Sequence, residues 1–213
     1  MSVISVFGGL LFRYAAIYAF LRRIPGHTFD ATTSRYDPIH SPRAMRKQKM
    51  SELVEVLSGD SAHTPPSILL EGLTTEAAHH SISGAPRTIY EELWHIAFWQ
   101  QITLDWVRGI ETSYPVHAAA GFPTADDAAK EDWDQLRERF FSTNKEAAAA
   151  AQDESRLGIE VRCPSRPGLP VRVMTVREQL ESLGAHNAYH FGRIVLLRQL
   201  QGLWPPPSGG FSW

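Results

Sequence analysis

The pattern of hydrophobic and polar positions predicts several amphipathic helices along the chain. The clearest one begins at Thr88, because Thr88 and Glu91 have the spacing of a capping box, in which each side chain satisfies a free amide of the first turn. From there, large side chains recur every three or four positions, which is the spacing of one helix face. We predict that this face points inward, that Gly109 ends the helix, and that the face carries Glu91, His95, Trp99, Ile102 and Trp106.

A helix is also predicted before this segment. It runs from about Ala44 to Leu57 and stops at the turn-forming residues 58–60. A short helical piece at 67–72 and a turn at 74–85 connect it to the helix that begins at Thr88.

Two more helices are predicted in the second half of the chain. One begins near Thr124 and runs through Trp133 to the alanines of 147–151, which favour a helix by intrinsic propensity. The last begins at a second capping box, Thr175 with Glu178, and ends at Gly202. Its predicted inner face carries Leu183, His186, His190, Ile194 and Leu197.

Between these two helices, the pattern changes to the alternation of a strand. Residues 159–162 and 171–173 alternate between apolar and charged side chains, and turn residues lie between them. Four amphipathic helices in one domain indicate a helical bundle. We therefore predict an all-α protein, an up-down four-helix bundle with a small extended or hairpin excursion before the last helix.

The predicted bundle occupies residues 44–207. Residues 1–43 are interpreted as a hydrophobic extension and a linker, and residues 208–213 as a carboxy-terminal tail of unassigned role. The linker, 25–42, is rich in proline, serine and threonine and is predicted to lack regular structure.

Three interpretations of the apolar run at 3–21 stay open. A weak membrane anchor is disfavoured by Arg13 near the middle of the run, since a charge there costs several kcal/mol. A secretory signal would carry a positive charge at its start, and Met1-Ser2-Val3 has none. The third interpretation is a loosely docked extension, or a working protein that starts near Met45 or Met50.

The overall composition limits the class of protein. The 213 residues are 43% hydrophobic and 21% charged, which is ordinary for a globular protein. A formal net charge of -2 argues against nucleic acid as a partner, because such proteins carry a basic stripe. A single cysteine, Cys163, allows no internal disulfide, so we expect a reducing, cytoplasmic location.

Three histidines form the candidate chemistry of the chain. His186 and His190 are four residues apart on one predicted helix, so they share a face, and His95 lies on the inner face of another helix. Three imidazoles leave coordination positions open, as in catalytic metal sites. A lone inward histidine is more often a satisfied core residue, so the spacing alone leaves both interpretations open.

Two segments resemble motifs of the DinB/YfiT-like superfamily. Residues 89–99, Ile-Tyr-Glu-Glu-Leu-Trp-His-Ile-Ala-Phe-Trp, resemble its second-helix motif, and 186–194, His-Asn-Ala-Tyr-His-Phe-Gly-Arg-Ile, resemble its fourth-helix motif. The resemblance extends over about 44–207. It implies a four-helix bundle with a divalent metal held by three histidines, which in this chain are His95, His186 and His190.

The resemblance also implies a function. Family members with assigned roles are mostly metal-dependent transferases or isomerases that use low-molecular-weight thiols, and many others are labelled metal-dependent hydrolases. We therefore expect an enzyme that acts on a small molecule with zinc or nickel, or with iron as a further candidate, and that uses water or a small thiol as the nucleophile. The alternative is a non-catalytic, metal-stabilised bundle that serves binding, sensing or oligomerisation. We also expect a homodimer.

Two further residues are candidates for the site. Glu91, one turn before His95, is a candidate catalytic residue that orients His95 or acts as a base, although completing the helix cap is the alternative. Arg193 is a candidate cofactor-binding residue, because the family often has glutamine where this chain has Arg193. No ligand role is predicted for His63, His79, His80 or His117. Asn187 and Tyr189 are interpreted as packing or surface residues, and Cys163 as a free thiol without a function.

Overall fold

The computed structural model describes residues 51–59 and 61–209. The predicted extension and linker of 1–43, the predicted helix start at Ala44, and the end of the tail at 210–213 lie outside the described residues. Among the described helices, none combines the length and the apolar character needed to cross a membrane.

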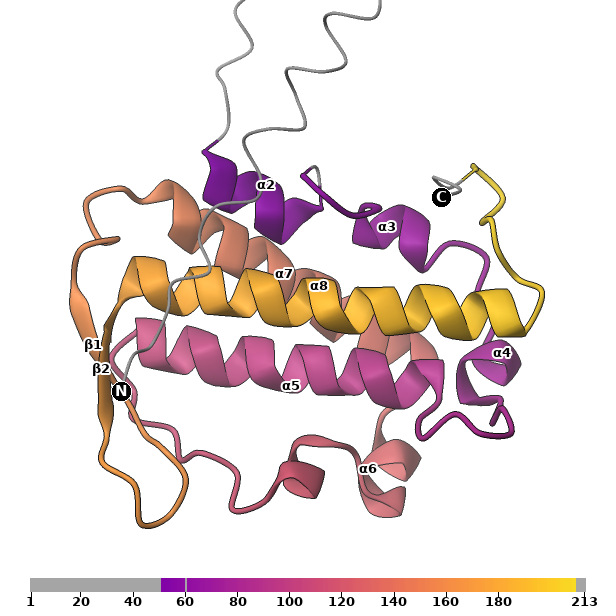
Figure 1. Cartoon of the computed structure of the whole chain (residues 1–213), viewed down its shortest axis with the longest axis horizontal. Coiled ribbons are helices and arrows are strands. Elements are labelled where there is room, and N and C mark those ends of the chain that lie inside the picture. Colours follow the sequence, from indigo (N-terminus) through magenta and orange to yellow (C-terminus); the bar gives the residue numbers. More distant parts are fainter. Residues whose placement is uncertain (1–50, 60, 210–213) are drawn as a thin grey trace, which may run out of the picture. The chain divides into compact units, whose positions relative to one another are not determined.

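Four helices form the bundle, which confirms the all-α fold class. These are α2 (Glu52–Ser58), α5 (Ile89–Val107), α7 (Trp133–Gln152) and α8 (Val176–Leu200). In the bundle, α5 packs against both α7 and α8, and α2 covers the other side of the same two helices (Figure 1). Because α5 has neighbours on several sides, apolar side chains all round it are buried, including Leu93, Ile96 and Trp106.

The predicted helix starts are confirmed by the capping geometry. Thr88 and Glu91 form a reciprocal capping box at the start of α5, and Thr175 and Glu178 form another at the start of α8. Helix α2 ends at Gly59. The φ of this glycine is 88°, a left-handed conformation that glycine adopts without steric cost.

Two sequence predictions of secondary structure were wrong in detail. The long third helix is two helices, α6 (Ala125–Lys130) and α7, because Asp132 and Gln135 form a capping box that starts a new helix. The predicted turn at 74–85 contains a short helix, α4 (Thr75–His79), whose first turn is capped by Thr74. Another short helix, α3 (Pro66–Leu69), precedes it.

The four helices of the bundle do not alternate strictly between up and down, because one consecutive pair, α5 and α7, runs in the same direction. The start of α5 lies beside the start of α7, where Tyr90 Oη donates a hydrogen bond to the Glu131 carbonyl over 2.7 Å. Further along both helices, Gln100 donates to Asn144 over 3.2 Å. The two helices therefore run in the same direction, and α8 runs in the opposite direction (Figure 1).

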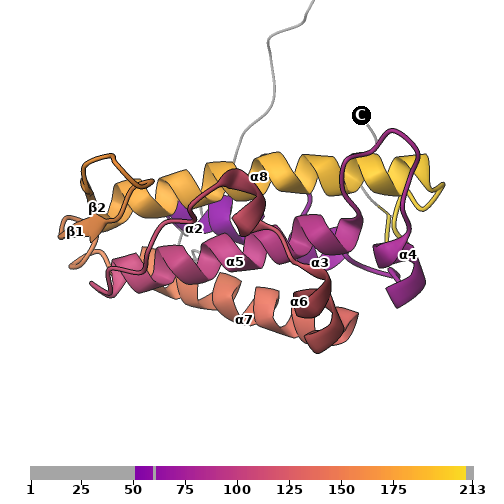
Figure 2. The same cartoon turned by 90° about the horizontal axis from the view of Figure 1, so that it is seen from below.

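A crossover connection makes this parallel arrangement possible. Residues 108–132 leave the end of α5 and return the chain to the start of α7, past the 3₁₀ helix η1 (Ala118–Gly121) and α6. Figure 2 shows the crossover running along one side of α5. It contacts α5 through η1, which brings backbone from a connection next to the middle of the bundle.

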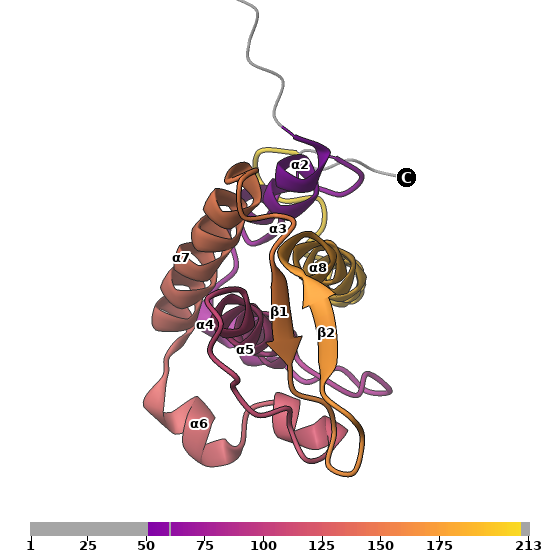
Figure 3. The same ribbon diagram turned by 90° about the vertical axis from the view of Figure 1, so that its left-hand side faces the viewer.

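The predicted excursion before the last helix is a β-hairpin. Strands β1 (Glu160–Cys163) and β2 (Arg172–Thr175) pair in antiparallel register, with Glu160 opposite Thr175. The hairpin contacts α5 through β1 and α8 through β2 (Figure 3). Arg166, in the turn of the hairpin, lines a cavity together with residues of α5 and α8.

Two glycines of α8 offer a matched test of the packing. A Cβ added to Gly184 would lie 2.6 Å from Cγ1 of Val56 in α2, whereas one added to Gly192 would meet nothing within 4 Å. Alanine favours a helix over glycine by about 1 kcal/mol at either position. Overpacking at Gly184 costs about 1–3 kcal/mol, because a β-branched side chain in a helix has few alternative rotamers.

We therefore expect Gly184→Ala to be less stable than Gly192→Ala by about 1–3 kcal/mol in urea unfolding. Equal stability of the two variants would show that α2 does not approach α8 this closely.

Candidate metal centre

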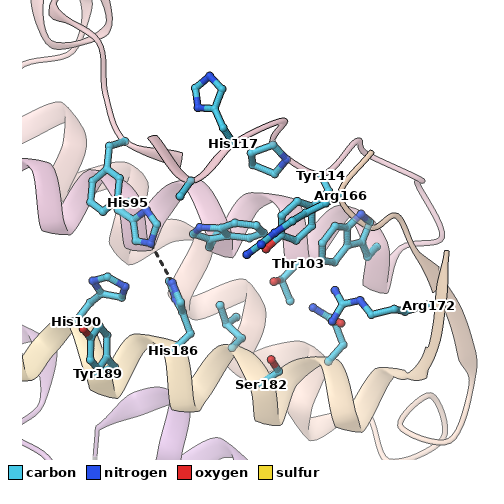
Figure 4. Close-up of a pocket in the computed structure, with 17 residues that line it drawn as sticks. His95, Thr103, Tyr114, His117, Arg166, Arg172, Ser182, His186, Tyr189 and His190 are labelled. Atoms are coloured by element: carbon cyan, nitrogen blue, oxygen red, sulfur yellow. Dashed lines mark hydrogen bonds between the residues drawn. The ribbon is translucent and has the colours of Figure 1, made fainter. Parts of the chain in front are cut away.

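Three histidines from two helices converge at one point of the bundle. His95 lies on α5, and His186 and His190 lie one turn apart on α8 (Figure 4). One ring nitrogen from each lies within 4.8 Å of the other two, and Nε2 of His95 is 3.1 Å from Nε2 of His186. The structure thus brings together all three residues that the sequence predicted as ligands.

Two of the three rings are held from behind by hydrogen-bond acceptors. Nδ1 of His95 lies 2.6 Å from the carbonyl oxygen of Gly121, and Nδ1 of His190 lies 2.7 Å from Oε2 of Glu92. A carbonyl oxygen only accepts hydrogen bonds, so Nδ1 of His95 carries a proton. The Glu92 carboxylate also accepts, so Nδ1 of His190 carries a proton as well. This tautomer leaves the lone pair on Nε2, the atom that faces the other rings.

Glu92 is a fully buried carboxylate between α5 and α8. Its Oε1 forms an ion pair with Nη2 of Arg193 at 2.8 Å, while its other oxygen holds His190. Leaving a buried carboxylate without a partner costs several kcal/mol, and Arg193 supplies the opposite charge. Arg193 therefore acts on the site through Glu92 in this structure, and its predicted contact with a cofactor stays a prediction.

Glu91 lies in the helix cap. Its carboxylate accepts a hydrogen bond from the amide of Thr88 over 2.8 Å and pairs with Arg87 over 3.2 Å. It is absent from the residues that line the cavity beside the histidines. Its catalytic role stays a prediction, whereas its role in the capping box is a structural fact.

Burial keeps two of the three histidine rings, those of His95 and His186, neutral. Loss of solvation lowers the pKa of His95 from 6.5 to about 4, and burial likewise lowers the pKa of His186 to about 4. Both imidazoles are therefore uncharged at neutral pH, and a cation that binds them does not have to displace a proton.

The histidines face a cavity of about 440 Å³, a size that suits a small molecule. Its walls are largely aromatic, with Trp99 and Trp106 from α5 and Tyr114 and Phe122 from the crossover. Phe122 also stacks on His95 with ring centres 4.1 Å apart. The crossover thus closes one side of the space in which the histidines lie.

A family comparison agrees with this arrangement. The model of the DinB superfamily matches residues 43–194, a span that includes all three histidines and Glu92. The chain belongs to the DinB superfamily. A search of curated proteins found no match to it.

The site of this DinB-superfamily chain fits a divalent cation. Two nitrogens that bind one zinc ion with tetrahedral geometry lie about 3.3 Å apart, since each lies about 2.0–2.1 Å from the ion. The separation of 3.1 Å between Nε2 of His95 and Nε2 of His186 is close to this value. The outer nitrogens of His95 and His190 already have partners, so their inner nitrogens, which face the other rings, are the candidate ligand atoms.

The residues for which the sequence predicted no role in the metal site lie in varied places in this DinB-superfamily bundle. His117 lines the cavity, and its Nδ1 accepts a hydrogen bond from the amide of Ala120. Tyr189 lines the rim of the cavity and is 63% exposed. Asn187 is buried, so of the two predicted alternatives it is a packing residue and not a surface residue. Cys163 is buried as well, with its Sγ 3.4 Å from Oε1 of Gln179.

Sequence reasoning missed two partners of the ligands, Glu92 and Gly121. A signal for Glu92 was present: it lies three residues before His95 and so shares its side of the helix, and the cap already uses Glu91. No local signal pointed to the Gly121 carbonyl, because it reaches His95 from 26 residues away along the crossover.

The buried histidines predict how the metal-free protein responds to acid. Unfolding restores a histidine pKa of about 6.5, so between pH 6.5 and 4 the unfolded state binds more protons than the folded state. The free energy of unfolding therefore falls as the pH falls through this window, by up to about 3 kcal/mol for each of His95 and His186.

Urea unfolding of chelator-treated protein at pH 7, 5.5 and 4.5 measures this loss of stability. Carboxylates also titrate near pH 4, so the readout is the difference between the natural chain and His186→Asn, which should lose less stability. Identical pH dependence in both proteins would contradict the depressed pKa of His186.

Proposed function

We propose that the protein is a metal-dependent enzyme in which His95, His186 and His190 bind a divalent cation beside a small-molecule cavity. The observation that carries the proposal is the set of inward-facing histidine nitrogens at the end of an aromatic cavity of about 440 Å³. Bundle cores commonly hold metals through side chains of facing helices. A purely structural site would gain nothing from opening into such a space.

The three histidines would supply all the protein ligands of the ion. A divalent cation with open coordination positions supplies Lewis acidity, which activates water or a thiol at neutral pH. Imidazole ligands suit zinc and nickel, and iron is a further candidate. Membership of the DinB superfamily supports a nucleophile that is either water or a low-molecular-weight thiol, and a small electrophile as its target.

The chain's own residues position this chemistry. Glu92 holds the Nδ1 proton of His190, and the Gly121 carbonyl holds that of His95, so both rings keep one orientation. Phe122 stacks on His95 with ring centres 4.1 Å apart, and Trp99 lies beside His186 with ring centres 6.1 Å apart. A flat or apolar reactant fits against these rings, with its reactive end toward the histidines.

Metal analysis tests the proposal directly. We expect about one zinc, nickel or iron ion per chain in protein purified without a histidine tag, and almost none in the His186→Ala/His190→Ala double variant. Thiol-transfer and hydrolysis assays on small electrophiles should then show activity that chelation removes. Activity that survives in metal-free protein would exclude the proposed role of the cation.

The non-catalytic alternative predicts a different result in the same samples. If the metal only stabilises the bundle, chelation should lower the melting temperature strongly while none of the tested small molecules is converted. Absence of metal in both proteins, with unchanged folding, would make the three histidines core residues.

A separate test concerns the carboxylate behind His190. Glu92→Gln retains the shape of the side chain but loses the charge that orients His190, so we expect metal affinity to fall about 10–100-fold. Glu91→Gln is the matched control, because glutamine also completes a capping box and the Glu91 carboxylate has Thr88 and Arg87 as its partners. Equal affinities of the two variants would show that Glu92 does not tune the site.

A further inference from the structure

The cavity beside the histidines has a second, positively charged end. Arg166, in the turn of the β-hairpin, and Arg172, at the start of β2, line the same cavity as His95, His186 and His190. Among the described residues that line it, none is aspartate or glutamate. In Figure 4 both arginine side chains extend from the hairpin into this space.

The two ends are connected by a floor of helix residues. His95, Trp99, Thr103 and Trp106 follow one another along α5, and Gln179, Ser182, Leu183, His186 and His190 follow one another in the opposite direction along α8. Trp106 lies eleven positions after His95, which is about 16 Å of helix. The cavity is therefore elongated, with the histidines near one end.

A continuous row of rings links the histidines to the arginines. The ring centre of Trp99 lies 6.1 Å from that of His186 and 5.0 Å from that of Tyr114. The guanidinium of Arg166 lies 6.0 Å from the ring centre of Tyr114, and that of Arg172 lies 6.0 Å from the ring centre of Trp106. An elongated apolar molecule along this row would reach both ends.

Neither guanidinium forms an ion pair within the described part of the chain. A neighbouring arginine of the same hairpin behaves differently, because Arg162 pairs with Glu111 over 2.7 Å and lies outside the cavity lining. The two guanidinium groups that face the cavity are thus available to pair with an anion. Each lies 6.0 Å from the centre of an aromatic ring, Arg166 at Tyr114 and Arg172 at Trp106.

We propose that Arg166 and Arg172 form an oxyanion-binding subsite that selects substrates with a carboxylate, sulfonate or phosphate at the end remote from the histidines. A guanidinium matches such groups because its planar fork donates two parallel hydrogen bonds. The molecule would carry an apolar middle that lies between Trp99, Trp106 and Tyr114. The position of its reactive end at the histidines rests on the function proposed above, whereas the anion subsite itself does not need the metal.

Binding of matched probes to the full-length chain tests the subsite. Isothermal titration calorimetry would compare 2-naphthoate with 2-naphthamide, which has a similar shape and no charge, and add benzoate and biphenyl-4-carboxylate with their amides to vary the length. Naphthalene-2-sulfonate and 2-naphthyl phosphate would identify the preferred oxyanion. The proteins are the natural chain, Arg166→Gln, Arg172→Gln, the double variant, and Arg162→Gln as the matched control.

We expect at least one carboxylate, sulfonate or phosphate probe to bind more tightly than its neutral counterpart. Each of Arg166→Gln and Arg172→Gln should weaken that probe about tenfold and leave the neutral counterpart within twofold, since a hydrogen bond to an ionised group accounts for about this factor. Arg162→Gln should change neither. Equal losses for charged and neutral probes, an equal loss in Arg162→Gln, or no preference for any oxyanion would overturn the proposal.

Repeating the titrations after chelation separates this inference from the proposed metal chemistry. An arginine-dependent preference that persists in protein without metal would support the subsite even if the metal analysis fails. Metal content that is unchanged in the arginine variants, together with no oxyanion preference, would refute the subsite and leave the metal site standing.

Discussion

The buried carboxylate of Glu92 is the constraint on which the site depends. It lies on α5 without exposure to solvent, and both of its partners, His190 and Arg193, lie on α8. A buried charge that loses one partner destabilises a protein by about 3–5 kcal/mol, so sliding α8 along α5 is strongly disfavoured. Because that register is fixed, His186 and His190 stay opposite His95.

The parallel direction of α5 and α7 has an effect on the site as well. A strict up-down connection would be a short turn, but here the chain must return along the bundle between the two helices. The returning segment passes over the histidines and provides both Phe122 and the Gly121 carbonyl. Glycine suits position 121, since an added Cβ would lie 3.3 Å from the ring of His95.

Much of this architecture was accessible from local patterns. Capping boxes at Thr88 and Thr175 located the two helices that carry the histidines, and helical spacing placed His95 and His190 in the core. The break at Asp132 was missed because no glycine or proline interrupts residues 125–151, although Asp132 and Gln135 have the spacing of a capping box. The choice of Glu92 over Glu91 was accessible, because the cap uses Glu91 and Glu92 shares the side of His95. The contact of Gly121 with His95 was not, because it depends on the path of a long connection.

The two ends of the cavity are made by different kinds of structure. Packed helices build the end with the histidines, where small displacements would separate the nitrogen atoms. The far end also carries Arg166 and Arg172 of the hairpin, and connections of this kind accept changes of length and sequence that a core does not. A change of sequence in the hairpin would therefore alter the charged end of the cavity while the histidines kept their positions.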